Sequence, residues 1–475
     1  MILPARAAIR SCNTLPVRVA LVTVALLLSV FSFRRTAAAD TIRDIVVEGN
    51  EKTTTDTVEL IARIDVGDDW DPKMLDRIKA DLVSSGLFKD VEAFFETCGP
   101  SSNPKCEESG IRVHITVHDK HSWVIAPAFY NQPTNVGGGV GFGENNLFGL
   151  NQKLLLYAQV ATGDSFFIGA WQIPSIGGTR FYSQFDTYLK YSRVIEYSPP
   201  TGETDNPGPV RQSRMEYLNG GFKLGVEPFR GIKLDARIRG AYVKYLKVAA
   251  LTDDPTKISD DPAFDIMNPT KPGKEGWDVS TEFGLTIDRR ANWYGIQSGY
   301  KYAASFEMSQ PVIGSDFHYY LWNVSLFKAV QVLERHNLIA KAQLHVGHHL
   351  PFQQEFTMGG TSMRGYINDQ FRGDLFVGGN LEYSLPLIGL FGLSVRGLAF
   401  VDSGYCAFLT HSDERTYLPR SFYDSSTTRA PFRNSVGVGT RLYLRQIVLP
   451  LLGVDVGYGL EVGDVQVYLA IGLTD

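Results

Sequence analysis

The sequence predicts a mainly β protein in which a small α+β segment (β-α-α-β-β) precedes a transmembrane antiparallel β-barrel of about 16 strands. Two observations lead to this prediction. Segments of about 10 residues alternate apolar and polar side chains along most of the chain after residue 121, which is the period of a β-strand. Residues 41–120 instead place two helical patterns between strand-like segments. The predicted divisions are therefore residues 1–39, 40–120 and 121–475.

The composition is that of a folded, β-rich protein. Of the 475 residues, 44% are hydrophobic and 12% are aromatic, and the formal net charge is −5. This apolar content excludes a disordered chain, and the lack of a basic excess argues against nucleic acid as a partner. The aromatic content and the 46 glycines are high for an α/β enzyme and favour a β-rich fold.

The first 39 residues have the pattern of a secretory signal peptide. Arg6, Arg10 and Arg18 precede the apolar run VALVTVALLLSVFSF, and three alanines stand just before Asp40. A basic region, an apolar core and a small-residue site are the parts of such a signal, so we expect cleavage before Asp40 and export of the mature chain. An uncleaved anchor helix is the alternative, although a run of about 15 residues is short for a membrane span of about 20.

Residues 41–120 predict two helices and a three-stranded sheet. TIRDIVVEGN alternates like a strand and ends at the turn dipeptide Gly49-Asn50. Thr55–Thr57 can cap a first helix, and a second helix is predicted from Asp71-Pro72. Its apolar residues recur at helical spacing: Met74, Leu75, Ile78, Leu82 and Val83. The strands VEAFFET and IRVHITV complete the order β-α-α-β-β.

The cysteines and histidines of the exported part suggest one disulfide and no metal. Cys98 and Cys106 flank the turn sequence Gly-Pro-Ser-Ser-Asn-Pro, a spacing that can close a hairpin loop with a disulfide in an oxidising compartment. Two free thiols are the alternative. His345, His348 and His349 lie near one predicted strand end without a carboxylate or cysteine at ligand spacing. We therefore predict no metal and no cofactor.

From Trp123 onward the alternation predicts strands and no helix. Three clear segments are Leu338–Val346, Val436–Arg445 and Val465–Leu473. A soluble sandwich alternates in the same way. A membrane barrel with aromatic girdles is favoured because charges recur on the polar face of successive strands and because aromatic residues stand at strand ends. These aromatic residues are Tyr157, Trp171, Phe181, Tyr182, Tyr319, Tyr320 and Trp322.

The connections between the predicted strands are uneven. Tyr197–Ser213, Thr252–Trp277 and Ala407–Phe432 are long, polar and rich in proline or aspartate, while other connections are brief. Membrane barrels have long loops on the outside and short turns on the inside. At about 22 residues for each strand with its connection, the segment accommodates about 16 strands.

Several short motifs resemble one family. IVVEGN, and SGLFKDV within LVSSGLFKDVEAFFE, resemble parts of a POTRA domain, a periplasmic module that binds polypeptides. GGGVGFGENNLFGLNQKLLL (Gly137–Leu156) resembles the first hairpin of the barrels that follow such domains. The mature chain therefore resembles the BamA/TamA-type outer-membrane protein assembly and translocation superfamily, which includes the mitochondrial sorting barrel and the two-partner secretion pores.

The most specific motif is SMRGY, within GGTSMRGYIND. It resembles the family's Arg-Gly-aromatic loop motif and implies that Arg364, Gly365 and Tyr366 belong to a long loop folded into the barrel lumen. In the family the arginine pairs with acidic residues on following strands, and Glu382 and Asp402 fit these partners. A carboxylate facing lipid would cost about 2–4 kcal/mol, so we expect both in the lumen, where one planar guanidinium can bridge them. A solvated arginine and two solvated lumen acids are the alternative.

The resemblance implies a non-enzymatic role in inserting polypeptides into, or moving them across, the outer membrane of a Gram-negative-type cell. An extended client would add to the edge of the POTRA sheet in the periplasm. A weakly paired seam between the first strand (Val124–Gln132) and the last (Val465–Leu473) would template a client strand, and Pro127 and Pro133 are consistent with weak pairing. The candidate client-binding residues are Val91, Glu92, Ala93, Phe94, Phe95 and Glu96.

The expected partners are unfolded or nascent outer-membrane polypeptides and the lipid bilayer, with periplasmic chaperones or accessory assembly proteins as further candidates. Two features depart from the bacterial assembly factors: only one POTRA domain is predicted, and the chain ends in Leu473-Thr474-Asp475 rather than an aromatic residue. A passive outer-membrane pore or receptor and a two-partner-secretion-type pore are the alternatives. An enzyme is disfavoured because no G-x-S-x-G or comparable catalytic pattern is present.

Overall fold

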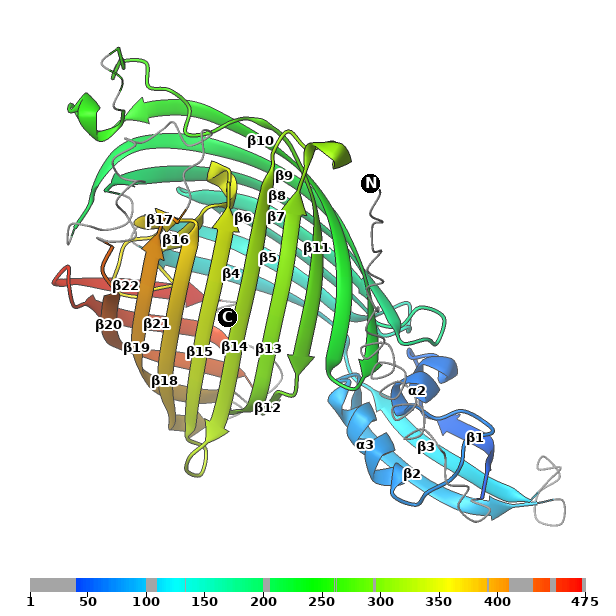
Figure 1. Cartoon of the computed structure of the whole chain (residues 1–475). Helices are drawn as coiled ribbons and strands as arrows, with labels where there is room; N and C mark the ends of the chain where they lie inside the picture. Colours follow the sequence, from blue (N-terminus) through cyan, green and yellow to red (C-terminus); the bar gives the residue numbers. More distant parts are fainter. Residues whose placement is uncertain are drawn as a thin grey trace, which may run out of the picture. The chain divides into compact units, whose positions relative to one another are not determined.

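The computed structural model describes residues 40–99, 109–132, 134–199, 206–259, 261, 263–293, 296–390, 393–409, 430–444 and 450–471. These residues form an α+β unit near the N-terminus and a barrel unit (Figure 1). The predicted signal peptide, Cys106 and Pro133 lie outside the described residues. Among the residues described, no helix is both long and apolar enough to cross a membrane.

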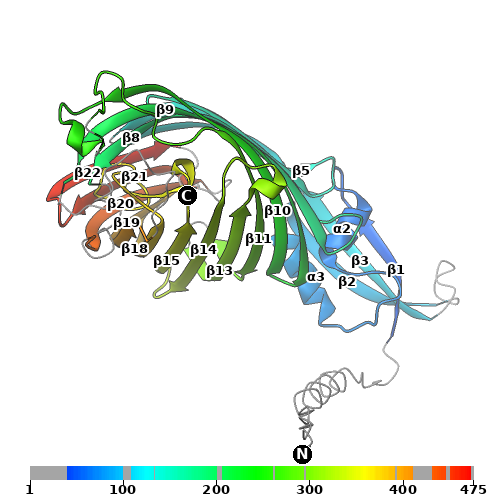
Figure 2. The ribbon, with the colours of Figure 1, turned by 45° about the horizontal axis from the view of Figure 1, so that its top comes forward.

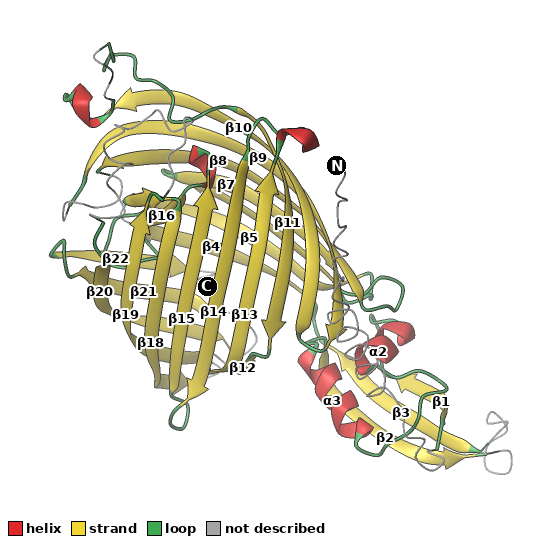
Figure 3. Ribbon diagram, viewed as in Figure 1, coloured by secondary structure: helices red, strands yellow, loops and turns green. Residues whose placement is uncertain are grey.

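The N-terminal unit has the predicted order of elements (Figure 3). It contains β1 (Ile42–Glu48), α2 (Thr55–Ala62), α3 (Met74–Ser84), β2 (Phe88–Cys98) and β3 (Gly110–Asp119). The sheet order is β1-β3-β2, with β1 parallel to β3, so β3 is central and both β1 and β2 are edge strands. Apolar side chains at alternate positions of β3 are fully or almost fully buried: Ile111, Val113, Ile115 and Val117.

Two further features of this unit are the start of helix α3 and the state of Cys98. Helix α3 begins at Met74 rather than at Asp71, whose carboxylate instead accepts a hydrogen bond from the backbone of Lys73 at 3.0 Å. The helix buries Ile78 and Leu82, as its periodicity predicts. Cys98 is buried and disulfide-bonded.

The second unit is a closed antiparallel barrel (Figure 2). Strands β11 and β12 both pair with β13, so the described strands fill sixteen positions around the barrel. The predicted sixteen-stranded antiparallel barrel is therefore confirmed. Its strands are β4 (Trp123–Gln132), β5 (Asn135–Leu147), β6 (Gln152–Ala161), β7 (Asp164–Ile173), β8 (Phe181–Ser198), β9 (Gly208–Phe229), β10 (Ile232–Ala250), β11 (Gly276–Asp288), β12 (Ala291–Trp293), β13 (Ile296–Ser309), β14 (Tyr319–Gln331), β15 (Asn337–His348), β18 (Leu375–Leu390), β19 (Leu393–Ala407), β20 (Arg433–Leu444), β21 (Pro450–Gly459) and β22 (Asp464–Ile471).

Alternate residues of each strand face the outside and the lumen. On β20, Val436 and Val438 are 38% and 60% exposed, whereas Ser435, which directly precedes Val436, is fully buried. On β22, Val465 and Val467 are exposed and Tyr468 is buried. An apolar outer face with polar residues turned inward is the arrangement required of a barrel in lipid.

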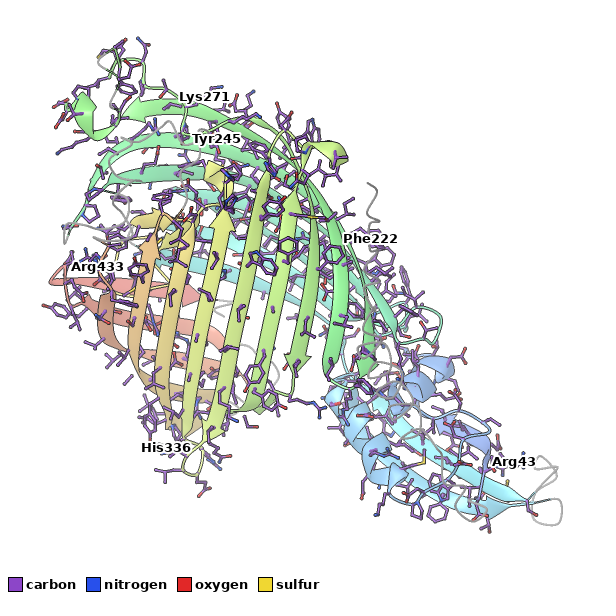
Figure 4. The ribbon with its side chains drawn as sticks, viewed as in Figure 1. Arg43, Phe222, Tyr245, Lys271, His336 and Arg433 are labelled. Carbon is purple, nitrogen blue, oxygen red and sulfur yellow. The ribbon has the colours of Figure 1, made fainter. Side chains whose placement is uncertain are left out.

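The long connections gather at one end of the barrel. They follow β8, β10, β13, β15 and β19, and since the strands alternate in direction, all five lie at the same end, here called the loop end. The connections at the other end, the turn end, are brief, and so are those after β4, β6 and β21 at the loop end. Figure 4 labels Lys271 at the loop end and His336 at the turn end. Among the described residues, three of these long loops contain a short 3-10 helix: η1 (Pro255–Lys257), η2 (Pro311–Ile313) and η3 (Phe352–Gln354).

Candidate functional site: an arginine loop inside the barrel

Residues 349–374, here called the lumen loop, connect β15 to β18 and contain the motif GGTSMRGYIND. The loop begins with η3 (Phe352–Gln354), and β16 (Phe356–Met358) and β17 (Phe371–Gly373) form a two-stranded sheet on either side of the motif. In Figure 2 this yellow segment lies within the ring of strands. The motif is thus the tip of a small hairpin rather than an isolated turn.

Strand register shows that the motif faces the lumen. Asp402 of β19 is paired with Asn380 of β18 and with Ser435 of β20, so these three side chains share one face of the sheet. Asp402 and Ser435 are buried, whereas Val401, on the opposite face, is 49% exposed. Because Arg364 binds Asp402, its side chain lies on the inner face of the barrel.

Arg364 forms a bidentate ion pair with Asp402. Its Nε and Nη2 atoms donate to the two carboxylate oxygens of Asp402 at 2.9 Å each, and its backbone N–H donates to the same group at 3.2 Å. The guanidinium also lies over the ring of Phe400, with Cζ 3.3 Å from the ring centroid. Paired hydrogen bonds and stacking fix the orientation of the arginine as well as its position.

Two further carboxylates surround the same guanidinium. Nη1 of Arg364 lies 3.5 Å from Glu382 Oε2 and 3.4 Å from Asp455 Oδ2. Asp455, on β21, also receives two hydrogen bonds from Arg441 of β20, at 2.6 and 2.8 Å. We call these five residues the Arg364 cluster. Glu382 and Asp402 lie where the resemblance implied the partners of Arg364 to be, whereas Asp455 and Arg441 were not predicted.

Glycines allow the loop backbone to lie directly on β21. A Cβ atom at Gly457 would come within 2.7 Å of the backbone nitrogen of Gly365, and a Cβ at Gly365 would come within 2.7 Å of the nitrogen of Gly459. Gly365 also has a φ of +95°, a conformation that side chains disfavour. The contact therefore requires glycine on both the loop and the strand.

Two tyrosines complete the attachment of the motif. The hydroxyl of Tyr366 donates to the backbone oxygen of Asn434 at 3.1 Å and is hydrogen-bonded to Glu461. The hydroxyl of Tyr468, on β22, accepts from the backbone N–H of Gly365 at 3.1 Å and donates to the backbone oxygen of Tyr366 at 2.7 Å. Beneath them lies a buried apolar cluster of Met358, Met363, Tyr366, Phe371, Phe376 and Cys406.

The start of the lumen loop is attached to other strands. Gln354 donates to Asp278 of β11 at 2.9 Å, and Phe352 packs edge-on against Tyr245 of β10 with ring centroids 5.7 Å apart. Asp278 belongs to a second buried ionic cluster, in which Arg239 of β10 donates to Glu307 of β13 at 2.7 Å. The lumen loop is therefore anchored on β10–β11 at its start and on β19–β22 at its tip.

The described pairing between the last and first strands, here called the seam, is short. Strands β22 and β4 are paired at three positions among the described residues, from Leu469↔Asn131 to Ile471↔Phe129, whereas β4 and β5 are paired at ten. Strand β4 ends at Gln132, one position beyond Asn131, so the described part of β22 before Tyr468 has no β4 residue in register with it. Among the described residues, β22 and β4 therefore have fewer paired positions than β21 and β22 or β4 and β5.

The predicted client-binding residues lie on edge strand β2. Phe94 and Phe95 are exposed, Ala93 is buried, and Phe94 stacks on His114 of β3 with ring centroids 4.7 Å apart. Glu96 contacts His114 and Arg112, and the hydrogen bond with His114 lowers the pKa of the Glu96 carboxyl. Val91 is half-buried and Glu92 exposed.

No cluster of three or more metal-binding side chains occurs among the residues that the structure describes.

A closed sixteen-stranded barrel with an arginine loop tied to acidic inner-face residues defines a class of outer-membrane barrel, and comparison with known families agrees. The Omp85 superfamily domain matches residues 146–462, and the chain belongs to this superfamily. Barrels of this superfamily are outer-membrane proteins. No curated protein sequence matches the chain.

Solved structures share the fold at low sequence identity. BamA from Haemophilus ducreyi lacking POTRA domains 1–3 has a TM-score of 0.59 at 15% identity, with 93% of this chain and 85% of that chain covered. CdiB from Acinetobacter baumannii has a TM-score of 0.60 at 14% identity, covering 92% and 74%. CdiB from Escherichia coli has a TM-score of 0.50 at 13% identity, covering 98% and 100%. These likenesses establish the fold.

Proposed function

We propose that the protein is a non-enzymatic assembly factor that helps polypeptides insert into the outer membrane, and that client strands are templated at the seam between β22 and β4. The small number of described strand pairs at this seam is the observation that carries the proposal. Backbone groups of a strand edge that lack partners are unfavourable in lipid. A client strand that pairs with these groups relieves this cost, and the seam, at which three pairs are described, is the proposed place of opening.

The attachment of the lumen loop at two places on the inner wall supports insertion at the seam over passive conduction. The lumen loop runs between anchors on β10–β11 and on β19–β22, and each anchor includes a buried ionic cluster. At the start of the loop, Phe352 joins a buried apolar cluster with residues of β9, β10 and two other long loops: Val210, Met215, Val243, Tyr245, Ile258 and Phe408. A polypeptide that passed through the lumen would have to displace these contacts, whereas one that enters at the seam would not.

Edge strand β2 is the proposed site of first contact with the client, in the periplasm. An edge strand presents unpaired backbone groups to which an extended chain can add. Phe94 and Phe95 project exposed rings from this strand, and exposed aromatic residues provide apolar contact for an unfolded chain. Glu96 at the same edge is held by Arg112 and His114, so the strand is positioned before a client arrives.

Reconstitution tests the proposal directly. The protein is placed in liposomes, an unfolded outer-membrane barrel client is added, and the folded, protease-protected yield is measured. We expect a higher yield than with empty liposomes and little conductance of ions without a client. A yield equal to that of empty liposomes, accompanied by steady conductance, would instead establish the passive pore. Client recovered inside the liposome interior rather than in the bilayer would establish a translocation pore.

A further inference from the structure

The tip of the lumen loop is bonded to both strands of the seam. On the β22 side, the hydroxyl of Tyr468 holds the backbone of Gly365 and Tyr366. On the β4 side, the side chain of Asn368 donates to Oε1 of Gln132 at 2.7 Å. A four-residue stretch of the loop, Gly365–Asn368, therefore connects the last strand of the barrel to the first.

This connection lies where the backbone pairing of the seam ends. The described pairing starts at Leu469↔Asn131, and Tyr468 and Gln132 occupy the next position toward the loop end. Tyr468 is two residues from Ala470, and Gln132 is two residues from Tyr130, the register partner of Ala470. The side chains of Tyr468 and Gln132 therefore lie on the same face of the sheet. Both contact the lumen loop, so this is the inner face. The loop thus connects the two strands from the lumen at the point where β4 ends.

The two attachments are unequal. The β22 side is held by the Tyr468 hydroxyl, which accepts from the N–H of Gly365 and donates to the backbone oxygen of Tyr366. Arg364 adds the ion pairs with Asp402 and Asp455. The β4 side is held by the single contact between Asn368 and Gln132, and Oδ1 of Asn368 is buried without a hydrogen-bond partner among the described residues. A buried amide that satisfies only part of its hydrogen-bonding capacity gains less from its position than one that satisfies all of it.

We propose that residues Gly365–Asn368 act as a latch that holds the seam closed from the lumen, and that the seam opens when the contact between Asn368 and Gln132 breaks while the loop stays attached to β22. Opening of the seam is taken from the proposed function. The latch specifies the contact that controls the opening, the strand that separates (β4) and the strand to which the loop stays attached (β22). It also assigns a role to Gly360, because a Cβ atom there would lie 2.3 Å from Oδ1 of Asn368 and would displace its side chain.

Hydrogen exchange of the full protein in lipid nanodiscs, without any client, tests the latch. Asn368→Ala removes one neutral side-chain hydrogen bond, so we expect amide exchange in the Phe129–Gln132 segment to rise about 2- to 10-fold. Exchange in the segment from Arg364 to Tyr366 should stay at the wild-type rate. The matched control is Gln353→Ala, which removes a contact of the same loop with Tyr245 at its other anchor and should leave the seam unchanged.

A double-mutant cycle separates the latch from a general loss of stability. Gln132→Ala should reproduce the effect of Asn368→Ala, and the double variant should show no further increase, because both changes remove the same contact. Unchanged exchange at Phe129–Gln132 in either single variant overturns the latch, as does a doubled effect in the double variant or an equal rise in all strands. Since no client is present, these results are independent of the insertion assay that tests the proposed function.

Discussion

Removal of Arg364 is the perturbation whose cost can be worked out most fully from the structure. Arg364→Ala eliminates two hydrogen bonds of 2.9 Å to Asp402, whose side chain is 5% exposed. Asp455 keeps its two bonds from Arg441 and stays paired. Asp402 keeps the side-chain amide of Asn380 and loses its charged partner. Glu382 loses only a longer contact, of 3.5 Å to Nη1, so the cost of the substitution falls mainly on Asp402.

A buried ion pair that loses one partner costs about 3–5 kcal/mol, because the remaining charge is left desolvated. The amide of Asn380 still donates to Asp402, so we expect a loss near the lower end, about 3 kcal/mol in the free energy of unfolding. Replacing the unpaired carboxylate of Asp402 by a neutral amide should recover part of this lost free energy of unfolding. The double variant Arg364→Ala/Asp402→Asn is expected to be more stable than Arg364→Ala by about 1–2 kcal/mol.

The assay is equilibrium unfolding by urea in lipid vesicles, followed by the heat-dependent migration of the folded barrel on gels. Arg290→Ala is the matched control, since Arg290 pairs with Asp288 at 2.8 Å with both side chains at least one-third exposed. Exposed pairs contribute about 0–1 kcal/mol. The reasoning is refuted if Arg364→Ala costs no more than Arg290→Ala, or if the double variant is less stable than Arg364→Ala.

Further variants test the other contacts. Gly457→Ala should displace the loop tip, destabilise the barrel by about 1–3 kcal/mol and make the Gly359–Asp369 segment sensitive to protease, because its Cβ would overlap the loop backbone; Gly240→Ala, where nothing lies within 4 Å of the new atom, should show neither effect. Tyr468→Phe should accelerate exchange of the Gly365 amide about 2- to 10-fold by removing its acceptor, without changing the register of β22, and an unchanged rate would contradict the assigned bond. A photo-crosslinker at Phe94 should capture an unfolded client, whereas one at Val66, equally exposed but on no strand of the sheet, should capture much less; equal yields would argue against the β2 edge as the first contact.

Most of the fold could be predicted from local sequence patterns. Period-2 alternation is a property of each strand by itself, so it indicated strands throughout residues 121–475 and placed Glu382 and Asp402 on inner faces before any register was known. Strand lengths were underestimated, since β8, β9 and β10 have 18, 22 and 19 residues rather than about 10. The period does not change where a strand leaves the membrane, so the alternation gives no signal for its end.

The rest of the site depends on register around the barrel. Asp455 lies between Val454 and Val456, and this pattern predicts an inward carboxylate, but nothing local brings it to an arginine 91 residues earlier in the chain. The same holds for Tyr468 and Gly457, which meet the loop only because β21 and β22 follow β20 around the wall. Gln132 and Asn368 are 236 residues apart, and closure of the barrel alone makes them neighbours.

Locking the seam tests the central claim most directly. Asn131→Cys/Leu469→Cys places two thiols at registered positions of β4 and β22, and Val456→Cys/Val467→Cys does the same across β21 and β22 as the control. Both are compared in the liposome insertion assay, oxidised and then reduced. The account predicts that oxidation of the seam pair abolishes client insertion, that reduction restores it, and that the control pair inserts clients in both states. Full insertion by the oxidised seam pair would contradict the account.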